Sequence, residues 1–247
     1  MDLSIIIPVY NEELSINTLY KELKSVLGFL NKTYEIIFIN DGSVDSTEEK
    51  IIELIKKDNV VRLITFVKNF GLSSALLAGF KHAIGDLIVS MDGDLQHDPK
   101  DIPSLLKEID KGYDLVCGYR KVRSDNILFR RMPSVLANKL GRVMFNLGVH
   151  DFSTTLRAYK NRSIKGIVIF NGGHRFIPVL AKNNNLLIGE VIVSHRIRNH
   201  GFSKYGSPMR FCKVIKDAII LKINDICLKF GVSLYFKEAE YDILQIV

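Results

Sequence analysis

A short acidic stretch, Asp92-Gly93-Asp94-Leu95-Gln96, carries the clearest chemical signal in the sequence. It follows the apolar run 86–91, which predicts a buried strand. Alternate side chains of an extended chain share one face, so Asp92, Asp94 and Gln96 are expected to point the same way. Such oxygen ligands suit Mg²⁺ or Mn²⁺ that also holds a diphosphate, and Gly93 leaves room for that ligand. An acidic turn at a strand end is the alternative interpretation.

A basic stretch, residues 194–206, offers the opposite charge. It carries two arginines, a lysine and two histidines, with glycines at positions 201 and 206. Arginine can bind phosphate through two parallel hydrogen bonds, and glycines are typical of loops. The stretch could equally be a solvated basic loop, but its place after a predicted strand favours contact with phosphate.

The overall composition agrees with an anionic partner. The chain has 247 residues, a formal net charge of +7 and a pI of about 9.2. This surplus suits a nucleic acid, an acidic membrane face or a phosphorylated substrate. Three cysteines without metal-ligand spacing argue against a disulfide framework and a zinc site, and favour a reducing compartment. We expect neither a signal peptide nor a membrane-spanning helix.

Strands and helices alternate through the first half of the chain. Apolar runs predict strands at 3–9, 34–40, 60–66, 86–91 and 114–118. This alternation predicts an α/β fold with an open, mostly parallel sheet and helices on both faces. Ligands of such sheets bind at the carboxyl ends of the strands, where polar residues cluster here. Asn11 is expected to cap the first helix, Asp45 with Glu48 resembles a capping box, and Asp98-Pro99 is expected to open a helix.

The second half is expected to pack onto the first, with strands at 154–159 and 186–193 and a helix at 208–230. That helix has an apolar stripe, and lysines border it. The stripe consists of Phe211, Ile215, Ile219, Ile223, Ile226 and Phe230. It could pack on the protein's own core or lie on an anionic membrane. We divide the chain into a domain of residues 1–207 and a C-terminal amphipathic helical segment, 208–247.

Several motifs together resemble the family 2 glycosyltransferases of the GT-A fold, and within them the dolichyl- or polyprenyl-phosphate sugar transferases. The motifs are Ile5-Ile6-Ile7-Pro8-Val9-Tyr10-Asn11-Glu12, Asn40-Asp41-Gly42-Ser43, Asn69-Phe70-Gly71, Met91-Asp92-Gly93-Asp94-Leu95-Gln96, Gly118-Tyr119-Arg120, Thr155-Leu156-Arg157-Ala158-Tyr159, His174-Arg175-Phe176-Ile177-Pro178, Glu190-Val191 and Ser203-Lys204-Tyr205-Gly206. Two departures stand out. Leu72 stands where many relatives have a lysine, and residues 208–247 are not expected to form the two membrane-spanning helices with which many bacterial relatives continue.

The resemblance implies a role for individual residues. The nucleoside would be held by Pro8, Tyr10, Glu12, Asp41 and Asp92. The metal, Mg²⁺ or Mn²⁺, would be held by Asp92, Asp94 and Gln96. The acceptor phosphate would be received by Arg120, Arg131, Ser134, Arg198, Ser203 and Lys204. Catalysis would rest on Asp94, Arg120, Arg131, Arg198 and Lys204.

The function expected from these features is inverting transfer of a sugar from a nucleotide-diphosphate sugar to a polyprenyl phosphate. The enzyme would work on the cytoplasmic face of a membrane as a peripheral protein, with an anchoring subunit or a second copy as a possible partner. One alternative is transfer to a sugar hydroxyl, for which Asp151 is the candidate base. A nucleotide-sugar-binding protein without catalysis is another. Nucleic-acid binding is not expected, because the acidic stretch opposes it.

Overall fold

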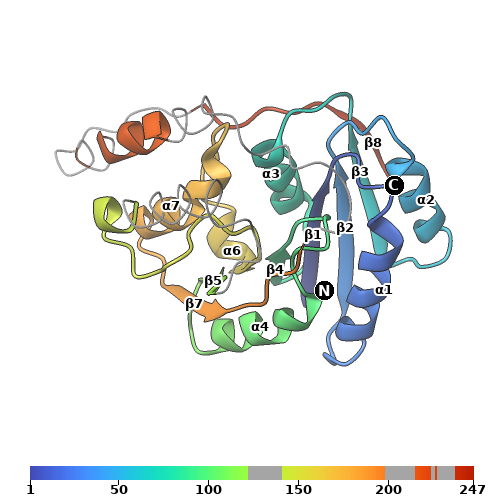
Figure 1. Ribbon diagram of the computed structural model, residues 1–247, viewed down its shortest axis with the longest axis horizontal. Helices are drawn as coiled ribbons and strands as arrows, with labels where there is room; N and C mark the ends of the chain where they lie inside the picture. Colours follow the sequence, from blue (N-terminus) through green and yellow to red (C-terminus); the bar gives the residue numbers. More distant parts are fainter. Residues whose placement is uncertain (122–140, 198–214, 224–225, 227–236) are drawn as a thin grey trace.

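An eight-stranded β-sheet forms the centre of the protein (Figure 1). The structure is a computed structural model that describes residues 1–121, 141–197, 215–223, 226 and 237–247. The strands are β1 (Leu3–Val9), β2 (Tyr34–Asn40), β3 (Val61–Phe66), β4 (Leu87–Ser90), β5 (Leu115–Tyr119), β6 (Arg157–Lys160), β7 (Ile188–Ile192) and β8 (Ile243–Ile246). Their order is β7-β5-β6-β4-β1-β2-β3-β8, in which only β6 and β8 run antiparallel to their neighbours. The predicted α/β class with a mostly parallel sheet is confirmed.

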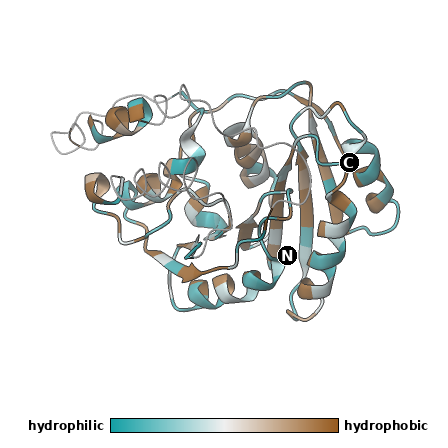
Figure 2. Cartoon of the chain, viewed as in Figure 1, coloured by the Kyte–Doolittle hydropathy of each residue, from teal (hydrophilic) through white to brown (hydrophobic). Residues whose placement is uncertain are grey.

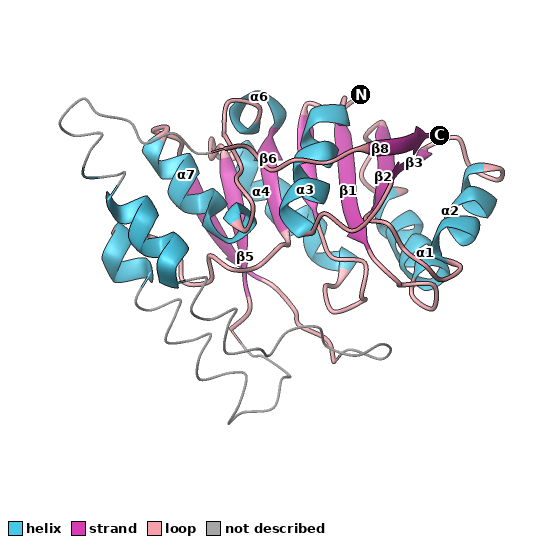
Figure 3. Cartoon of the chain, turned by 90° about the horizontal axis from the view of Figure 1, so that it is seen from above, coloured by secondary structure: helices cyan, strands magenta, loops and turns pink. Residues whose placement is uncertain are grey.

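Helices cover both faces of this sheet (Figure 3). They are α1 (Ile16–Leu27), α2 (Thr47–Ile55), α3 (Leu72–His82), α4 (Ile102–Asp110), α6 (Asn161–Ile164) and α7 (Ile177–Asn183), with short 3₁₀ turns η1 (Pro99–Asp101) and η3 (Gly173–Phe176). In β1, Ile5 and Ile7 pack in the core that α1, α2 and α4 cover, whereas Ile6 packs in the core under α3, α6 and α7. Burial on both faces explains why the parallel strands are apolar along most of their length (Figure 2).

The strands of the first half begin and end within one residue of their predicted limits. In the second half, the strand expected at 154–159 begins only at Arg157. The residues before it form a turn, in which the Leu156 N–H donates to Thr154 Oγ1 at 3.3 Å. A hydroxyl group that competes for a backbone donor thus delays the strand.

The capping box expected at the start of α2 does not form. The helix begins at Thr47, and Asp45 Oδ1 accepts the Thr47 N–H at 3.1 Å. The Glu48 carboxylate is turned instead toward the sheet, where it accepts a hydrogen bond from Asn40 Nδ2 at 3.0 Å. That prediction is wrong because Glu48 bonds to the Asn40 amide on β2 instead of to a backbone N–H at the start of its own helix.

Residues 215–223 form a helix beyond α7, on the opposite side of the molecule from β8 (Figure 1). Its Leu221 is fully buried and packs in one cluster with Phe145 and Phe176. The isoleucines of the predicted stripe lie on the outside and are 42–48% exposed: Ile215, Ile219, Ile223 and Ile226. Core packing and an apolar outer face therefore coexist in this helix. Phe211 and Phe230 lie outside the described residues.

The described chain ends in a strand. Residues 237–247 cross over α3, where Ser74 Oγ donates to the Glu240 carbonyl at 2.7 Å, and finish in β8 (Figure 1). The expectation that 208–247 is a helical segment is wrong here, because β8 pairs with the open edge of β3 and the Leu63 N–H donates to the Val247 carbonyl. None of the helices in the described parts of the chain is long and apolar enough to span a bilayer.

Candidate active site

Three neighbouring strands, β4, β1 and β2, carry the side chains expected to bind the nucleoside. Pro8 lies near the end of β1, and Tyr10 and Glu12 follow it; Asp41 follows β2 directly and Asp92 follows β4. Parallel strands in adjacent positions bring their carboxyl ends to one edge of the sheet. The structure therefore brings all five residues to the same edge, and their contact with a nucleoside stays a prediction.

The segments after β1 and β2 are bound tightly to each other. The Asn11 N–H donates to Ser43 Oγ and the Glu12 N–H to Thr47 Oγ1, both at 2.9 Å. Asn11 has a left-handed φ of +53°, and its Oδ1 accepts the Val44 N–H at 2.9 Å. The expectation that Asn11 caps α1 is therefore wrong. Its side chain instead holds the segments after β1 and β2 against each other.

Asp41 fixes a third loop at the same edge. Its carboxylate is buried and accepts the Phe70 N–H at 2.7 Å and the Gly71 N–H at 2.9 Å. Asn69 Nδ2 donates to the Asp41 carbonyl at 3.2 Å. Asp41 thus holds the loop that leads into α3, a role that the sequence did not reveal.

The acidic segment after β4 is a turn and not an extended strand. The strand ends at Ser90, and Leu95 has a left-handed φ of +64°. Asp94 Oδ1 accepts the Gln96 N–H at 3.1 Å, which closes the turn. Alternation along a strand is therefore the wrong reason for grouping Asp92, Asp94 and Gln96, although one tight turn still carries all three. The expected helix start after the turn is confirmed, because the Asp98 side chain caps η1.

Gly93 is required by packing. A Cβ atom at this position would lie 2.7 Å from Val9 Cγ1 and 3.4 Å from the Pro8 carbonyl oxygen. The distance to Val9 Cγ1 is too short for normal van der Waals contact. The glycine thus lets the acidic turn lie directly on the end of β1, and the expectation that it also leaves room for a ligand stays a prediction.

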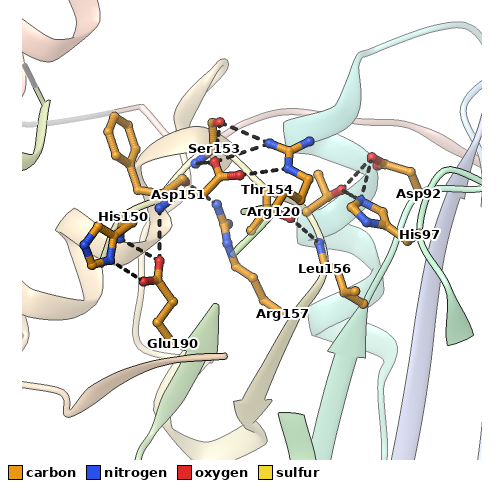
Figure 4. A network of polar contacts seen from close by, with 12 residues as sticks. Asp92, His97, Arg120, His150, Asp151, Ser153, Thr154, Leu156, Arg157 and Glu190 are labelled. Carbon is orange, nitrogen blue, oxygen red and sulfur yellow. Dashed lines mark hydrogen bonds and ion pairs between the residues drawn. The ribbon is translucent and has the colours of Figure 1, made fainter. Parts of the chain in front are cut away.

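Asp92 is held by two neighbours of the turn (Figure 4). Thr155 Oγ1 donates to Asp92 Oδ2 at 2.5 Å, and His97 Nε2 lies 3.5 Å from the same oxygen. Desolvation by the surrounding protein raises the pKa of Asp92, but hydrogen bonds from His97 and Thr155 outweigh it, so the pKa lies below its ordinary value. The turn therefore presents an ionised carboxylate in a fixed direction.

Arg120 follows β5 and is paired with Asp151 (Figure 4). Arg120 Nε donates to Asp151 Oδ2 at 2.8 Å and its Nη2 to Asp151 Oδ1 at 3.3 Å. Ser153 Oγ donates to the same carboxylate at 2.9 Å, and only 2% of the Asp151 side chain is exposed. The guanidinium is thus held in one orientation, and the carboxylate that was a candidate base serves as its counter-ion.

Two further side chains hold the loop that contains Asp151. The carboxylate of Glu190, on β7, accepts the His150 N–H at 2.6 Å and the Asp151 N–H at 3.0 Å. The buried Arg157 donates through Nη2 to the Phe152 carbonyl at 2.6 Å. Glu190 and Arg157 lie in motifs of the resemblance, but the sequence did not assign them this role. The Glu190 contacts join segments about 40 residues apart, whereas Arg157 bonds to a carbonyl only five residues earlier in the chain.

The first residues of the basic stretch lie against the acidic turn. The Arg196 N–H donates to the Gln96 carbonyl at 2.9 Å, and its guanidinium pairs with Glu22 and Asp98, each at 2.7 Å. Arg196 therefore joins the basic stretch to α1 and to the acidic turn. The remaining expected acceptor residues lie outside the described part of the chain: Arg131, Ser134, Arg198, Ser203 and Lys204.

The donor set of the acidic turn fits a divalent cation. Within the described residues, no group of three or more Asp, Glu, His or Cys side chains could hold a metal by itself. Mg²⁺, however, is commonly bound by one or two carboxylates together with phosphate oxygens of the substrate. Asp92 and Asp94 provide such carboxylates, and Gln96 adds an amide oxygen. These residues suit an ion that shares its coordination sphere with a diphosphate.

Sequence comparison assigns the family. The sequence profile of Glycosyl transferase family 2 matches residues 4–168, so the chain belongs to this family. It is 36% identical over 223 residues to the dodecaprenyl-phosphate galacturonate synthase of Rhizobium johnstonii, covering 89% of this chain and 66% of that protein. It is 39% identical over 205 residues to an undecaprenyl-phosphate 4-deoxy-4-formamido-L-arabinose transferase of Shewanella sediminis, covering 82% and 61%. The chain thus spans slightly less than two thirds of the length of these relatives.

Structural comparison assigns the fold. Glucosyl-3-phosphoglycerate synthase of Mycobacterium tuberculosis, solved with Mn²⁺ and UDP-glucose, superposes with a TM-score of 0.68 at 17% identity, covering 94% of this chain and 81% of that one. TarS of S. aureus, solved with UDP-GlcNAc, gives a TM-score of 0.61 at 19% identity, covering 90% and 66%. The fold is therefore GT-A, as the resemblance implied.

Proposed function

We propose that this protein transfers a sugar from a nucleotide-diphosphate sugar to a polyprenyl phosphate, in one step that inverts the anomeric centre. The curated relatives above, which are named for the same type of acceptor lipid, support this proposal. The observation that carries it is that one segment, residues 151–155, holds two of the expected site residues. Through Thr155 it holds Asp92, and through Asp151 it holds Arg120.

This segment places an acidic and a basic group beside each other. The charge of Arg120 is close enough to contribute to the lowered pKa of Asp92. A metal-binding carboxylate and an arginine at one strand edge suit a reaction in which two phosphate groups meet, one on the donor and one on the acceptor. Both groups are held by their neighbours before any substrate binds, which is the arrangement expected for electrostatic catalysis.

The pairing of Asp151 favours a phosphate acceptor over a sugar hydroxyl. A hydroxyl nucleophile needs a base to remove its proton. Asp151 was the candidate for that base, but it is buried and bonded to Arg120 and Ser153. A phosphate monoester has its second pKa near roughly 6 and is ionised at neutral pH without help. The arrangement therefore suits an acceptor that needs no base.

The reaction follows from these positions. An oxygen of the acceptor phosphate attacks the anomeric carbon while the bond from that carbon to the nucleoside diphosphate breaks, and the nucleoside diphosphate leaves. Asp94, Asp92 and Gln96 would hold Mg²⁺ or Mn²⁺, which neutralises the charge of the leaving group. Arg120 would orient the acceptor phosphate, and Arg131, Ser134, Arg198, Ser203 and Lys204 are proposed to complete its binding site.

The test is a transfer assay with a panel of radiolabelled nucleotide-sugars and two acceptors that differ in one group, polyprenyl phosphate and the parent polyprenol. We expect a labelled lipid product only with the phosphate and only with Mg²⁺ or Mn²⁺ present. Transfer to the polyprenol would favour the hydroxyl-acceptor alternative. Nucleotide-sugar binding without transfer to any acceptor would favour a sensor.

We also propose that the outer face of the helix at 215–223 binds the membrane. A polyprenyl phosphate keeps its chain in the bilayer, so the active site must reach the headgroups. Ile215, Ile219 and Ile223 provide exposed apolar area, and Lys216 is exposed beside them. Each lysine near an anionic surface contributes on the order of 1 kcal/mol, less at high salt. Lys222 contributes less, because its Nζ lies over the Phe145 ring.

Sedimentation with anionic vesicles tests this binding. We expect Ile219→Glu to reduce pelleting at low salt, whereas Phe29→Glu, which adds the same charge to an exposed position at the end of α1, should not. If the parent protein stays in the supernatant, the helix does not bind membranes, and an anchoring subunit or a second copy becomes the better proposal. Action at the cytoplasmic face, without a nucleic-acid partner, is part of the same proposal.

A further inference from the structure

A row of polar side chains crosses three strands at the edge where the nucleotide is expected to bind. The strand register places Asn40 of β2 opposite Thr65 of β3, and Thr65 opposite Gln245 of β8. Partners in register project from the same face of a sheet. Asn40 and Thr65 are buried, although nearly all their neighbours in β2 and β3 are apolar. Polar residues buried in such a sheet call for an explanation.

Glu48, on α2 above this row, connects its two ends. One carboxylate oxygen accepts a hydrogen bond from Gln245 Nε2, and the other accepts one from Asn40 Nδ2 at 3.0 Å. Asn40 Oδ1 in turn accepts the Ser43 N–H at 3.0 Å. An uninterrupted chain of hydrogen bonds therefore runs from the last strand to the turn after β2.

That turn forms part of the expected nucleoside site. It begins with Asp41, and Ser43 Oγ accepts the N–H of Asn11, between the expected ligands Tyr10 and Glu12. A displacement of Asn40 would therefore shift the loop after β2, through Ser43, and the loop after β1, through Asn11. The chain of bonds thus reaches both loops that carry expected nucleoside ligands.

We propose that Gln245 and Glu48 are positioning residues of the donor site, and that strand β8 thereby holds the loops of the expected nucleotide site although it contacts no substrate. The proposal rests on the proposed function, because it assumes that these loops bind the nucleotide part of the donor. Glu48 accepts both amides because its carboxylate offers one oxygen to each. In this partly buried network, the loss of one bond leaves a polar group without its partner.

Exchanging the amide of Gln245 and the carboxylate of Glu48 tests the proposal. Gln245→Glu places two carboxylates face to face and removes the donor to Glu48. Adding Glu48→Gln restores one amide donor and one carboxylate acceptor between the same positions. Repacking alone would not make the second substitution repair the first, whereas a positioning role through this bond requires it.

The experiment measures calorimetric affinity for UDP, GDP and CDP with MnCl₂, and the KM of the transfer reaction for each substrate. For the nucleotide that the parent protein binds, Gln245→Glu should raise Kd and donor KM about tenfold, which corresponds to about 1.4 kcal/mol. The acceptor KM should stay within about twofold, and the double variant should bind nucleotide within about twofold of the parent, a difference below about 0.5 kcal/mol.

Two controls isolate the chain of bonds. Leu244→Glu adds the same charge to the neighbouring position of β8, which is 64% exposed. Thr65→Val removes a hydroxyl from the middle of the row, and that Oγ1 has no hydrogen-bond partner among the described atoms. Neither should change nucleotide affinity. Equal binding by the parent and Gln245→Glu, or no recovery in the double variant, would overturn the proposal. A parent that binds none of the nucleotides would overturn the proposed function itself.

Discussion

Replacing Asp151 with alanine tests the interpretation of this residue as the counter-ion of Arg120. Removing one partner of a buried ion pair costs about 3–5 kcal/mol, because the other charge stays behind without compensation. The Arg120 side chain is 15% exposed, so water can partly hydrate it once Asp151 is gone. We therefore expect the free energy of unfolding to fall by the lower limit of this range, about 3 kcal/mol. In a domain of this size that loss lowers Tm by roughly 6–12 °C.

Thermal and urea unfolding measure the effect, with Glu108→Ala as the control. Glu108 pairs with Lys111 at 2.7 Å, but 56% of that lysine side chain is exposed, so the loss should be below about 1 kcal/mol. Transfer to polyprenyl phosphate should fall together with stability in Asp151→Ala. If Asp151→Ala is as stable as the control and yet inactive, Asp151 acts as a base, and the argument for a phosphate acceptor fails.

Three further predictions concern the metal, the acceptor and pH. Asp94→Ala should abolish transfer and Mn²⁺-dependent nucleotide binding while the unfolding transition is retained; full activity of this variant in EDTA would contradict the metal role. Arg198→Ala and Lys204→Ala should raise the acceptor KM more than the nucleotide Kd from calorimetry, and equal losses would assign them to the donor. Asp58→Asn should lower the free energy of unfolding at pH 7. Desolvation opposes ionisation of Asp58, but Lys24 and Tyr20 lower its pKa below the ordinary value. The stability that this carboxyl contributes is therefore complete above roughly pH 4 and is lost as pH falls through its folded-state pKa, so the difference between parent and variant should shrink as pH falls below about 4 in urea titrations.

The order of elements could be predicted from the sequence because it depends on local patterns. Apolar runs such as 3–9 and 34–40 can only be buried, and their alternation with amphipathic segments defines a parallel sheet. The edge that carries the site follows from the same pattern, since the carboxyl ends of parallel strands meet. The pairing of Asp94 with Gln96 in one short segment was also readable, because a few residues of chain keep it together whatever their backbone angles.

What the polar side chains contact was decided by the tertiary structure alone. Asp151 was the candidate base of the hydroxyl-acceptor alternative because a carboxylate in a sequence shows no partner, and only the approach of β5 brings Arg120 to it. Asn11 and Glu48 were assigned to helix caps, the nearest donors along the chain, but stronger partners come from other strands and loops. A residue's type fixes what it can bond to, and the packing of distant segments selects which of those bonds form.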